Sequence, residues 1–206
     1  MARSKSELSR PLSSVVLGYH GCDREDGECL LSGATAPKLS SESWHWLGAG
    51  VYFWEGDPLR ALEWAKSKAA RNQCKEPFVI GAVIDLGNCF DLQVRENFQL
   101  LQDAYASFEK VIMAAGRPMP VNRKAPKDQS ESKVLRYLDC AVIDHLHKMT
   151  NGAFDTVRGI FTEGNPAYPG GGMYELTHSQ IAVRNLDCIK GMFRLSSAAG
   201  SLSTDS

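Results

Sequence analysis

The sequence has no long apolar run, no strong charge of either sign and no paired cysteine motif, and each absence excludes a class of protein. No segment approaches the roughly 20 apolar residues that a membrane-spanning helix needs. A net charge of −1 gives no global attraction to nucleic acid or an anionic membrane, so such a partner must bind a local patch. The six cysteines are scattered without a CxxC pair, which disfavours a zinc site and favours reduced thiols.

What is present is the composition of an ordinary globular protein. Of the 206 residues, 43% are hydrophobic and 23% are charged, which is enough for one substantial core. We expect a single domain over residues 14–195, between disordered polar segments at 1–13 and 196–206. The first residues include basic side chains but no apolar segment of the signal-peptide type, so the expected location is the cytoplasm.

The most informative stretch is Leu47 to Ala65, LGAGVYFWEGDPLRALEWA. Two glycines, which permit close backbone approaches, lead into the aromatic and β-branched run Val51–Trp54, which predicts a strand. Asp57 is a good N-cap and Pro58 suits the first helical position, so a helix is expected to begin there. The stretch therefore predicts an aromatic residue held at the edge of a glycine-lined opening.

The remaining periodicity predicts an α+β fold. Apolar runs indicate further strands at 15–21, 77–86, 154–161 and 180–183. Apolar residues at three- and four-residue steps indicate two helices, with a core-facing stripe at Phe98, Leu101, Tyr105, Phe108 and Ile112 in the first and positions 134–149 in the second. We expect these two helices to form a hairpin, inserted at about 95–149 into a β-rich body. Residues 22–46 are polar and predict a loop.

Three polar or aromatic residues lie on expected strands from distant parts of the chain. They are His20, Tyr52 and Gln180, and each is placed to face a cleft. For His20 the alternative is an ordinary core histidine with satisfied hydrogen bonds. His178, two residues before Gln180, would share its face of the strand and could orient it, or could be a solvent-exposed edge residue.

A positively charged segment follows the first helix of the expected hairpin. Its cations are Arg117, Arg123, Lys124, Lys127, Lys133 and Arg136, against the two acids Asp128 and Glu131. Such a run is commonly a solvated surface, but it is also the one candidate in the sequence for a patch that follows phosphates.

The order and surroundings of the three candidate residues resemble the ADP-ribosyltransferases of the diphtheria-toxin and poly-ADP-ribose-polymerase type. That family carries His, Tyr and Glu on three separate strands. The matching pieces here are Tyr19–Gly21, then Gly48–Phe53 with the sequence GAGVYF, then Ser179–Asn185 with the sequence SQIAVRN. The resemblance consists of short pieces between about residues 15 and 193 and leaves the expected hairpin at 95–149 unmatched.

The resemblance implies two small antiparallel sheets, roughly perpendicular and flanked by helices, with NAD as co-substrate in the crevice between them and no metal. His20 would bond the adenosine-side ribose, and the Gly21 backbone would hold the nicotinamide carboxamide. Tyr52 would stack on the nicotinamide ring. Gly50 and Ala61 would border the bound NAD.

The third motif departs from the family because Gln180 stands where a glutamate is usual. Glutamine can bond a ribose hydroxyl but cannot place negative charge beside the developing oxocarbenium ion. Two carboxylates near in sequence could compensate, Glu163 and Glu175. Glu163 is preferred because it follows directly on an expected strand, although it could equally be an exposed loop charge.

The resemblance implies an NAD-dependent mono-ADP-ribosyltransferase that modifies a protein or nucleic acid. Two alternatives stay open: an NAD glycohydrolase, in which water is the acceptor, and a non-catalytic module that binds NAD or ADP-ribose. By analogy with small members of the family, a role as a bacterial toxin or defence effector is expected, with a neutralising antitoxin or immunity protein as partner and no membrane contact.

Overall fold

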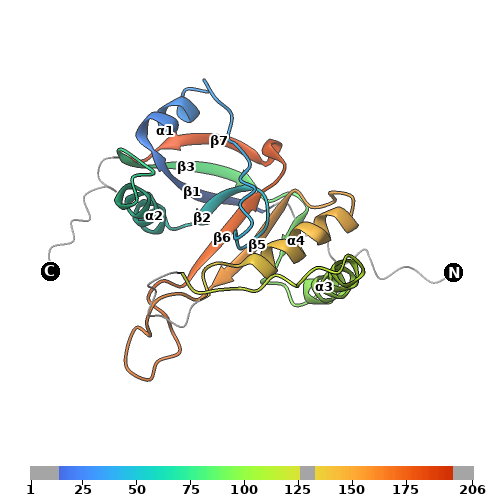
Figure 1. The fold of residues 1–206 in the computed structure, drawn as a ribbon. Helices are drawn as coiled ribbons and strands as arrows, with labels where there is room; N and C mark the ends of the chain where they lie inside the picture. The colour runs from blue at the N-terminus through green and yellow to red at the C-terminus, as the bar shows by residue number, and fades with distance from the viewer. Residues whose placement is uncertain (1–13, 126–132, 197–206) are drawn as a thin grey trace.

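The computed structural model describes residues 14–125 and 133–196 as a mixed fold of helices and strands (Figure 1). Its elements are β1 (Val15–Asp23), α1 (Arg24–Leu31), β2 (Val51–Glu55), α2 (Pro58–Ala70), β3 (Pro77–Asp85), β4 (Cys89–Asp91), α3 (Asn97–Ala114), α4 (Tyr137–Met149), β5 (Thr156–Phe161), β6 (His178–Val183), the 3-10 helix η2 (Leu186–Cys188) and β7 (Ile189–Arg194). The segments expected to be disordered, 1–13 and 196–206, lie outside the described residues except for Ser196, as does Lys127 of the basic segment. All six cysteines are free thiols.

The seven strands form one mixed sheet in the order β4-β5-β6-β2-β1-β3-β7. The α+β class is thus confirmed, but the strands belong to one hydrogen-bonded sheet rather than two, and β4 runs parallel to β5. The sheet is nearly divided in the middle. Strand β1 pairs with β3 along its whole length, yet it pairs with β2 only at Gly18↔Glu55 and Tyr19↔Trp54. Beyond this short junction β1 and β2 no longer pair.

A core formed mainly by strand residues lies between the two halves of the sheet. It joins Phe53 and Ile181 from one half to Ala82 and Ile84 from the other, all of them at most 1% exposed. Gly18 marks how closely the halves approach, because a Cβ added there would lie 2.6 Å from the Ile84 side chain and 2.8 Å from that of Phe53. Burial of this apolar surface therefore folds the two halves onto each other about the short junction.

Helices α3 and α4 cover the half of the sheet that contains β4, β5 and β6 (Figure 1). The expected helical hairpin is confirmed, but the predicted core stripe of α3 is only partly right. Ala104 and Ile112 are buried, whereas Phe98 and Tyr105 are 43% and 38% exposed. The predicted stripe contained only large apolar residues. Ala104, which was not part of it, is buried, and its small side chain allows close packing of the helix.

Helix α2 begins as its sequence predicts. Asp57 Oδ1 accepts a hydrogen bond of 2.9 Å from the Arg60 amide, and Pro58 occupies the first turn. Ala61 and Ala65 are fully buried, while Leu59 is 47% exposed. The inward face is built from alanines because α2 packs directly against the backbone of β1.

Four elements were not predicted: α1, β4, the 3-10 helix η2 and β7. Helix α1 lies in the expected loop 22–46, where Asp23 caps the Glu25 amide and Gly27 interrupts the helical pattern. Gly27 is required by packing, because a Cβ there would lie 2.5 Å from the Phe78 ring. Strand β4 spans three residues, too few to produce a periodic signal.

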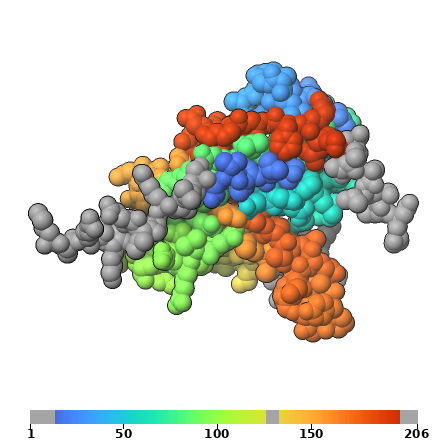
Figure 2. Space-filling model, turned by 180° about the vertical axis from the view of Figure 1, so that it is seen from behind, coloured from blue at the N-terminus to red at the C-terminus, as the bar shows by residue number. Residues whose placement is uncertain are grey.

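The connection between β5 and β6, residues 162–177, projects from the body of the molecule (Figures 1 and 2). Its three consecutive glycines and two prolines account for the lack of regular structure. Over residues 14–125 and 133–196, no helix combines the length and apolar character required to cross a membrane.

Candidate active site

The three candidate residues lie on three adjacent strands in the middle of the sheet. His20 is on β1, Tyr52 on β2 and Gln180 on β6, and these strands are neighbours in the order β6-β2-β1. Gln180 pairs across the strands with Trp54, and Trp54 pairs with Tyr19, the residue before His20. Segments more than 120 residues apart in sequence therefore meet at the point where β1 and β2 separate.

His20 occupies that point of separation. Its Nδ1 atom lies 2.8 Å from the Tyr52 carbonyl oxygen, where a backbone amide of β1 would otherwise have bonded. A carbonyl oxygen only accepts, so Nδ1 carries the proton. Burial lowers the pKa of His20, which keeps the ring neutral. The Nε2 atom is consequently an acceptor, able to receive a hydrogen bond from a hydroxyl group.

Two glycines at the site lie where a side chain would collide with a neighbouring element, as at Gly21, or be tightly packed against one, as at Gly50. A Cβ on Gly21 would lie 2.0 Å from the Ala61 carbonyl oxygen of α2, and one on Gly50 would lie 3.0 Å from Ala182 and 3.1 Å from the Val183 carbonyl oxygen. Gly21 and Ala61, both expected to border NAD, are thus in direct contact. Their contact fixes the distance between α2 and β1.

Tyr52 is bonded to its own loop. Its hydroxyl donates to the Gly48 carbonyl oxygen at 2.7 Å and accepts from the Leu47 amide at 2.8 Å. The His45 ring packs against the phenol ring, with centroids 4.7 Å apart. Burial raises the pKa of Tyr52, so the hydroxyl stays protonated. Tyr52 therefore holds residues 47–48 in place, and its ring also packs against the core that contains Trp46 and Leu47.

The loop that contains Gly48 and Gly50, which we call the glycine loop, is also held by helix α4. Asp144 accepts hydrogen bonds from the Ala49 amide at 2.9 Å and from Arg184 at 2.7 Å. Gly48, with φ of +73°, passes directly beside this pair, since an added Cβ would lie 2.4 Å from the Arg184 guanidinium. The hairpin of α3 and α4, which has no counterpart in the resemblance, thus supports the most informative motif of the sequence.

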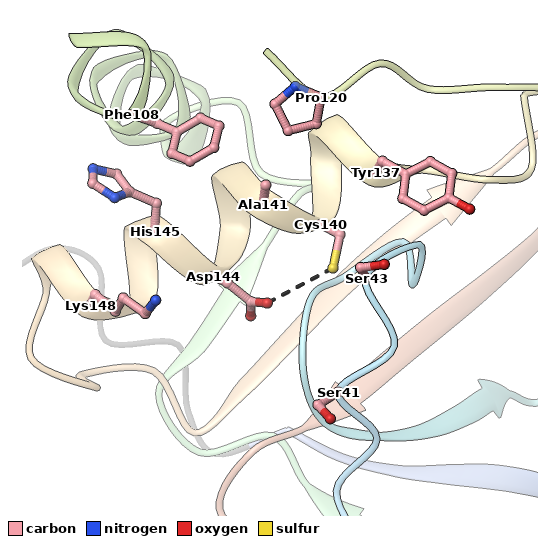
Figure 3. A pocket seen from close by; sticks show the side chains of 10 residues that line it. All are labelled: Ser41, Ser43, Phe108, Pro120, Tyr137, Cys140, Ala141, Asp144, His145 and Lys148. Atoms are coloured by element: carbon pink, nitrogen blue, oxygen red, sulfur yellow. Dashed lines mark hydrogen bonds between the residues drawn. The ribbon is translucent and has the colours of Figure 1, made fainter. Parts of the chain in front are cut away.

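A cavity of about 370 Å³ lies between α4 and the segment that carries Ser41 and Ser43 (Figure 3). Cys140, Asp144, His145 and Lys148 project into it from successive turns of the helix, and Phe108 of α3 closes one side. The Cys140 thiol lies 3.8 Å from Asp144 Oδ2. Burial raises the pKa of this thiol to about 12, which makes it a poor nucleophile. His20, Tyr52 and Gln180 do not line this cavity.

Gln180 is oriented by His178. The His178 Nδ1 atom lies 2.7 Å from the Leu176 carbonyl oxygen, so Nδ1 carries the proton. Burial lowers the pKa of His178, and the neutral ring presents Nε2 as an acceptor 3.0 Å from the Gln180 Nε2 atom. The amide nitrogen of Gln180 is therefore the donor, and Oε1 takes no hydrogen bond from any described residue.

Glu163 stands next in this series of contacts. Its Oε2 atom lies 2.8 Å from the Arg60 guanidinium and 3.8 Å from His178 Nδ1. Glu163 is therefore close to Gln180 only through His178, and its charge is already paired with Arg60. The Glu175 side chain is exposed. Its backbone amide donates a hydrogen bond to the Asn165 carbonyl oxygen, within the loop between β5 and β6. Of the two carboxylates, only Glu163 belongs to the neighbourhood of Gln180.

Sequence reasoning missed Arg60, His45 and Trp64. Trp54 packs on Trp64 of α2 at 6.1 Å between ring centroids, and Trp64 lies 6.4 Å from Trp44. The indole N–H of Trp54 is buried without a partner among the described residues. In the sequence, Arg60 and Trp64 are four residues apart on the helix that begins at Pro58. This spacing predicts that they are close to each other, but it does not predict that they are close to β6.

The buried histidine predicts a pH dependence of stability. Because the folded-state pKa of His178 lies below its ordinary value of 6.5, the unfolded chain takes up protons first as the pH falls. We expect the contribution of His178 to lower the free energy of unfolding as the pH falls below about 6.5. Above that pH, this contribution should be constant. The His178→Gln variant should lose up to about 1.4 kcal/mol per pH unit of this slope. Urea titrations from pH 5 to 8 measure it, and an equal slope in both proteins would contradict it.

Over the described ranges 14–125 and 133–196, no group of three or more histidine, cysteine or acidic side chains is arranged to hold a metal ion. Comparison of the chain with protein-family models and with curated proteins finds no match. The functional argument therefore rests on the residues and distances above.

Proposed function

We propose that this protein is an NAD-dependent mono-ADP-ribosyltransferase that modifies a macromolecule. One observation carries the proposal: His20, Tyr52 and Gln180, chosen from sequence alone, meet on adjacent strands where β1 and β2 part. A split in a sheet leaves backbone groups without ladder partners, and such positions suit a bound ligand. The near division between β1 and β2 supports the proposal, although the strands form one hydrogen-bonded sheet and not the two sheets that the resemblance implies.

The polar atoms at the split suit a substrate with several hydroxyl groups. His20 Nε2 is an acceptor and would bond the adenosine-side ribose, while the Gly21 backbone would hold the nicotinamide carboxamide. Gln180 Oε1, fixed as an acceptor by His178, would bond a hydroxyl of the nicotinamide-side ribose. Tyr52 would form one wall of the nicotinamide pocket.

The proposed reaction is a substitution at C1 of the nicotinamide-side ribose. The bond from C1 to the nicotinamide nitrogen breaks, and its electron pair neutralises the pyridinium ring as nicotinamide leaves. The acceptor nucleophile forms the new bond to C1, and its proton passes to water. Because the transition state is an oxocarbenium ion, the main contribution of the protein is fixed geometry and oriented dipoles.

The pairing of Glu163 with Arg60 bears on the choice of acceptor. No free carboxylate among the described residues contacts Gln180, so an acceptor that is already nucleophilic is favoured over one that needs a strong base. The same feature argues against chain elongation, which requires activation of a ribose hydroxyl. A role as a toxin or defence effector with a neutralising partner would follow from such an activity.

The deciding experiment uses NAD labelled in its adenylate half, incubated with the protein and a cell extract. Parallel samples of the product are treated with protease or with nuclease. Label bound to protein or nucleic acid supports transfer. Free ADP-ribose as the sole product would identify a glycohydrolase, and binding without turnover would identify a non-catalytic module. Tyr52→Phe, which keeps the ring but frees the loop, should retain NAD binding better than Tyr52→Ala; full NAD turnover in Tyr52→Ala would overturn the site.

A further inference from the structure

A second cavity, of about 530 Å³, lies between α3, the start of α4 and β5. We call it the β5 cavity. Its walls are mainly aromatic and apolar and include Trp46, Phe98, Leu101, Tyr105 and Phe161, together with an ion pair in which Arg136 Nη1 lies 3.0 Å from Asp139 Oδ2. Phe98 and Tyr105 are the two residues of α3 that were expected in the core and are instead exposed. The cavity explains their position, because they border it rather than pack against α4.

The β5 cavity adjoins the candidate active site on the side away from His20. Gly159 and Phe161, which line the cavity, pair across the strands with Gln180 and His178. The rings of Trp46 and Phe161 lie 5.7 Å and 6.0 Å from the His178 ring. In the strand order β5-β6-β2-β1, Gln180 thus separates the cavity from the split that holds His20. An acceptor would reach the reacting carbon from this side if NAD occupied the split.

The walls favour a flat aromatic ligand with polar edges. The Trp46 and Phe161 rings meet edge to face at 4.3 Å, and the Arg136 guanidinium lies over both, 4.8 Å and 5.9 Å from their centroids. The Arg136 Nε atom is buried and has no hydrogen-bond partner among the described residues. Gln102 and Thr162 add an amide and a hydroxyl group to the lining. A purely hydrocarbon ring would leave these polar groups unused.

Positive charge adjoins the same wall. The Trp46 indole donates to the Val134 carbonyl oxygen at 2.6 Å, and in sequence Val134 directly follows Lys133 and precedes Arg136 by two residues. Arg123 is bridged to Leu135 through two backbone hydrogen bonds of 2.8 Å and 3.0 Å. The described part of the basic segment therefore runs beside an aromatic cavity, and this combination is typical of surfaces that bind single-stranded nucleic acid.

We propose that the β5 cavity binds an unpaired base of a single-stranded nucleic acid, which is the acceptor of the transferase. The role of the base as acceptor rests on the proposed function, whereas binding of the base itself needs no NAD. A ring nitrogen or exocyclic amine of the base would form the bond to C1 of the ribose and release its proton to water. Bases carry such nucleophiles already, in agreement with the lack of a free carboxylate beside Gln180.

The test measures binding of fluorescent single-stranded DNA and RNA oligonucleotides by anisotropy, without NAD, at a fixed salt concentration. Stacking on an aromatic side chain is worth about 1–3 kcal/mol per base, so Phe98→Ala and Tyr105→Ala should each weaken binding by about tenfold. Val111→Ala is the matched control, because Val111 is 53% exposed on the same helix and outside the cavity. An abasic oligonucleotide of equal length should bind more weakly than the normal one.

Two results would overturn the proposal: equal affinity for the normal and the abasic strand, or unchanged affinity in both aromatic variants. Label transferred to protein alone in the NAD assay would overturn it as well. Failure of the proposed function is seen separately, as absence of NAD binding and turnover in the same preparations. Oligonucleotide binding that depends on Phe98 and Tyr105 in a protein inactive toward NAD would keep the base site and remove the transferase.

Discussion

Replacing Gln180 by alanine is expected to lower kcat/KM for release of nicotinamide from NAD by about 10²-fold, the usual cost of removing one oriented group from a transition-state contact. The side chain is held by His178 so that Oε1 faces no described protein donor, and this acceptor is lost in the variant. Most of the loss should be in kcat, because the bond to the ribose hydroxyl strengthens as positive charge develops at C1. Nicotinamide release at saturating and limiting NAD measures the two parameters.

Gln180→Glu is the matched variant. It keeps an acceptor at the same place and adds the negative charge that the family resemblance leads one to expect there, so its turnover should equal or exceed that of the wild type. The carboxylate would stand beside His178 Nε2 and raise the pKa of that ring. Wild-type rates in both Gln180→Ala and Gln180→Glu would remove Gln180 from the site and leave the proposed reaction without its third residue.

Asp144→Ala is expected to reduce the free energy of unfolding by about 2–3 kcal/mol, less than the loss of one partner from a fully buried pair. The reason is the exposure of the partners: the Arg184 side chain is 8% exposed, whereas that of Asp144 is 34% exposed. The variant leaves the Arg184 guanidinium and the Ala49 amide without their acceptor. Urea unfolding at neutral pH measures the change.

A double-mutant cycle separates the charge pair from simple truncation. Arg184→Met removes the unpaired cation, so the double variant should be more stable than the sum of the two single losses predicts. Asp103→Ala is the control, since Asp103 is an exposed residue of α3 whose carboxylate accepts a hydrogen bond from Gln99, and the change should be within about 0.5 kcal/mol. A loss in Asp144→Ala no larger than in this control would show that α4 does not support the glycine loop.

Much of the fold was predictable because its signals are local. The cap at Asp57, the proline at the start of α2 and the apolar runs of β1, β3 and β5 act on neighbours in sequence, so the elements were found close to their observed positions. The errors occurred where packing overrides the local pattern. Gly27 interrupts α1 to make room for Phe78, and Phe98 faces a cavity rather than the core.

The candidate site was also predictable only in part. Sequence alone selected His20, Tyr52 and Gln180, because each belongs to a short motif with glycines or strand residues at fixed spacing. It could not reveal that Arg60 pairs with Glu163, 103 positions away, or that Asp144 bonds Ala49 across 95 positions. Such contacts leave no trace in local periodicity, since any surface arginine or aspartate has the same pattern.

The sequence by itself determined most of the longer elements of this protein and the three residues at the centre of its proposed function. Only the tertiary structure decided that β1 and β2 pair over two residues and then separate, that His20 fills the gap, and that helices α3 and α4 support the glycine loop. The physical reason is that strand registers and helix contacts are set by burial of both halves of the sheet at once. That burial sums over residues from the whole chain, and no single segment encodes it.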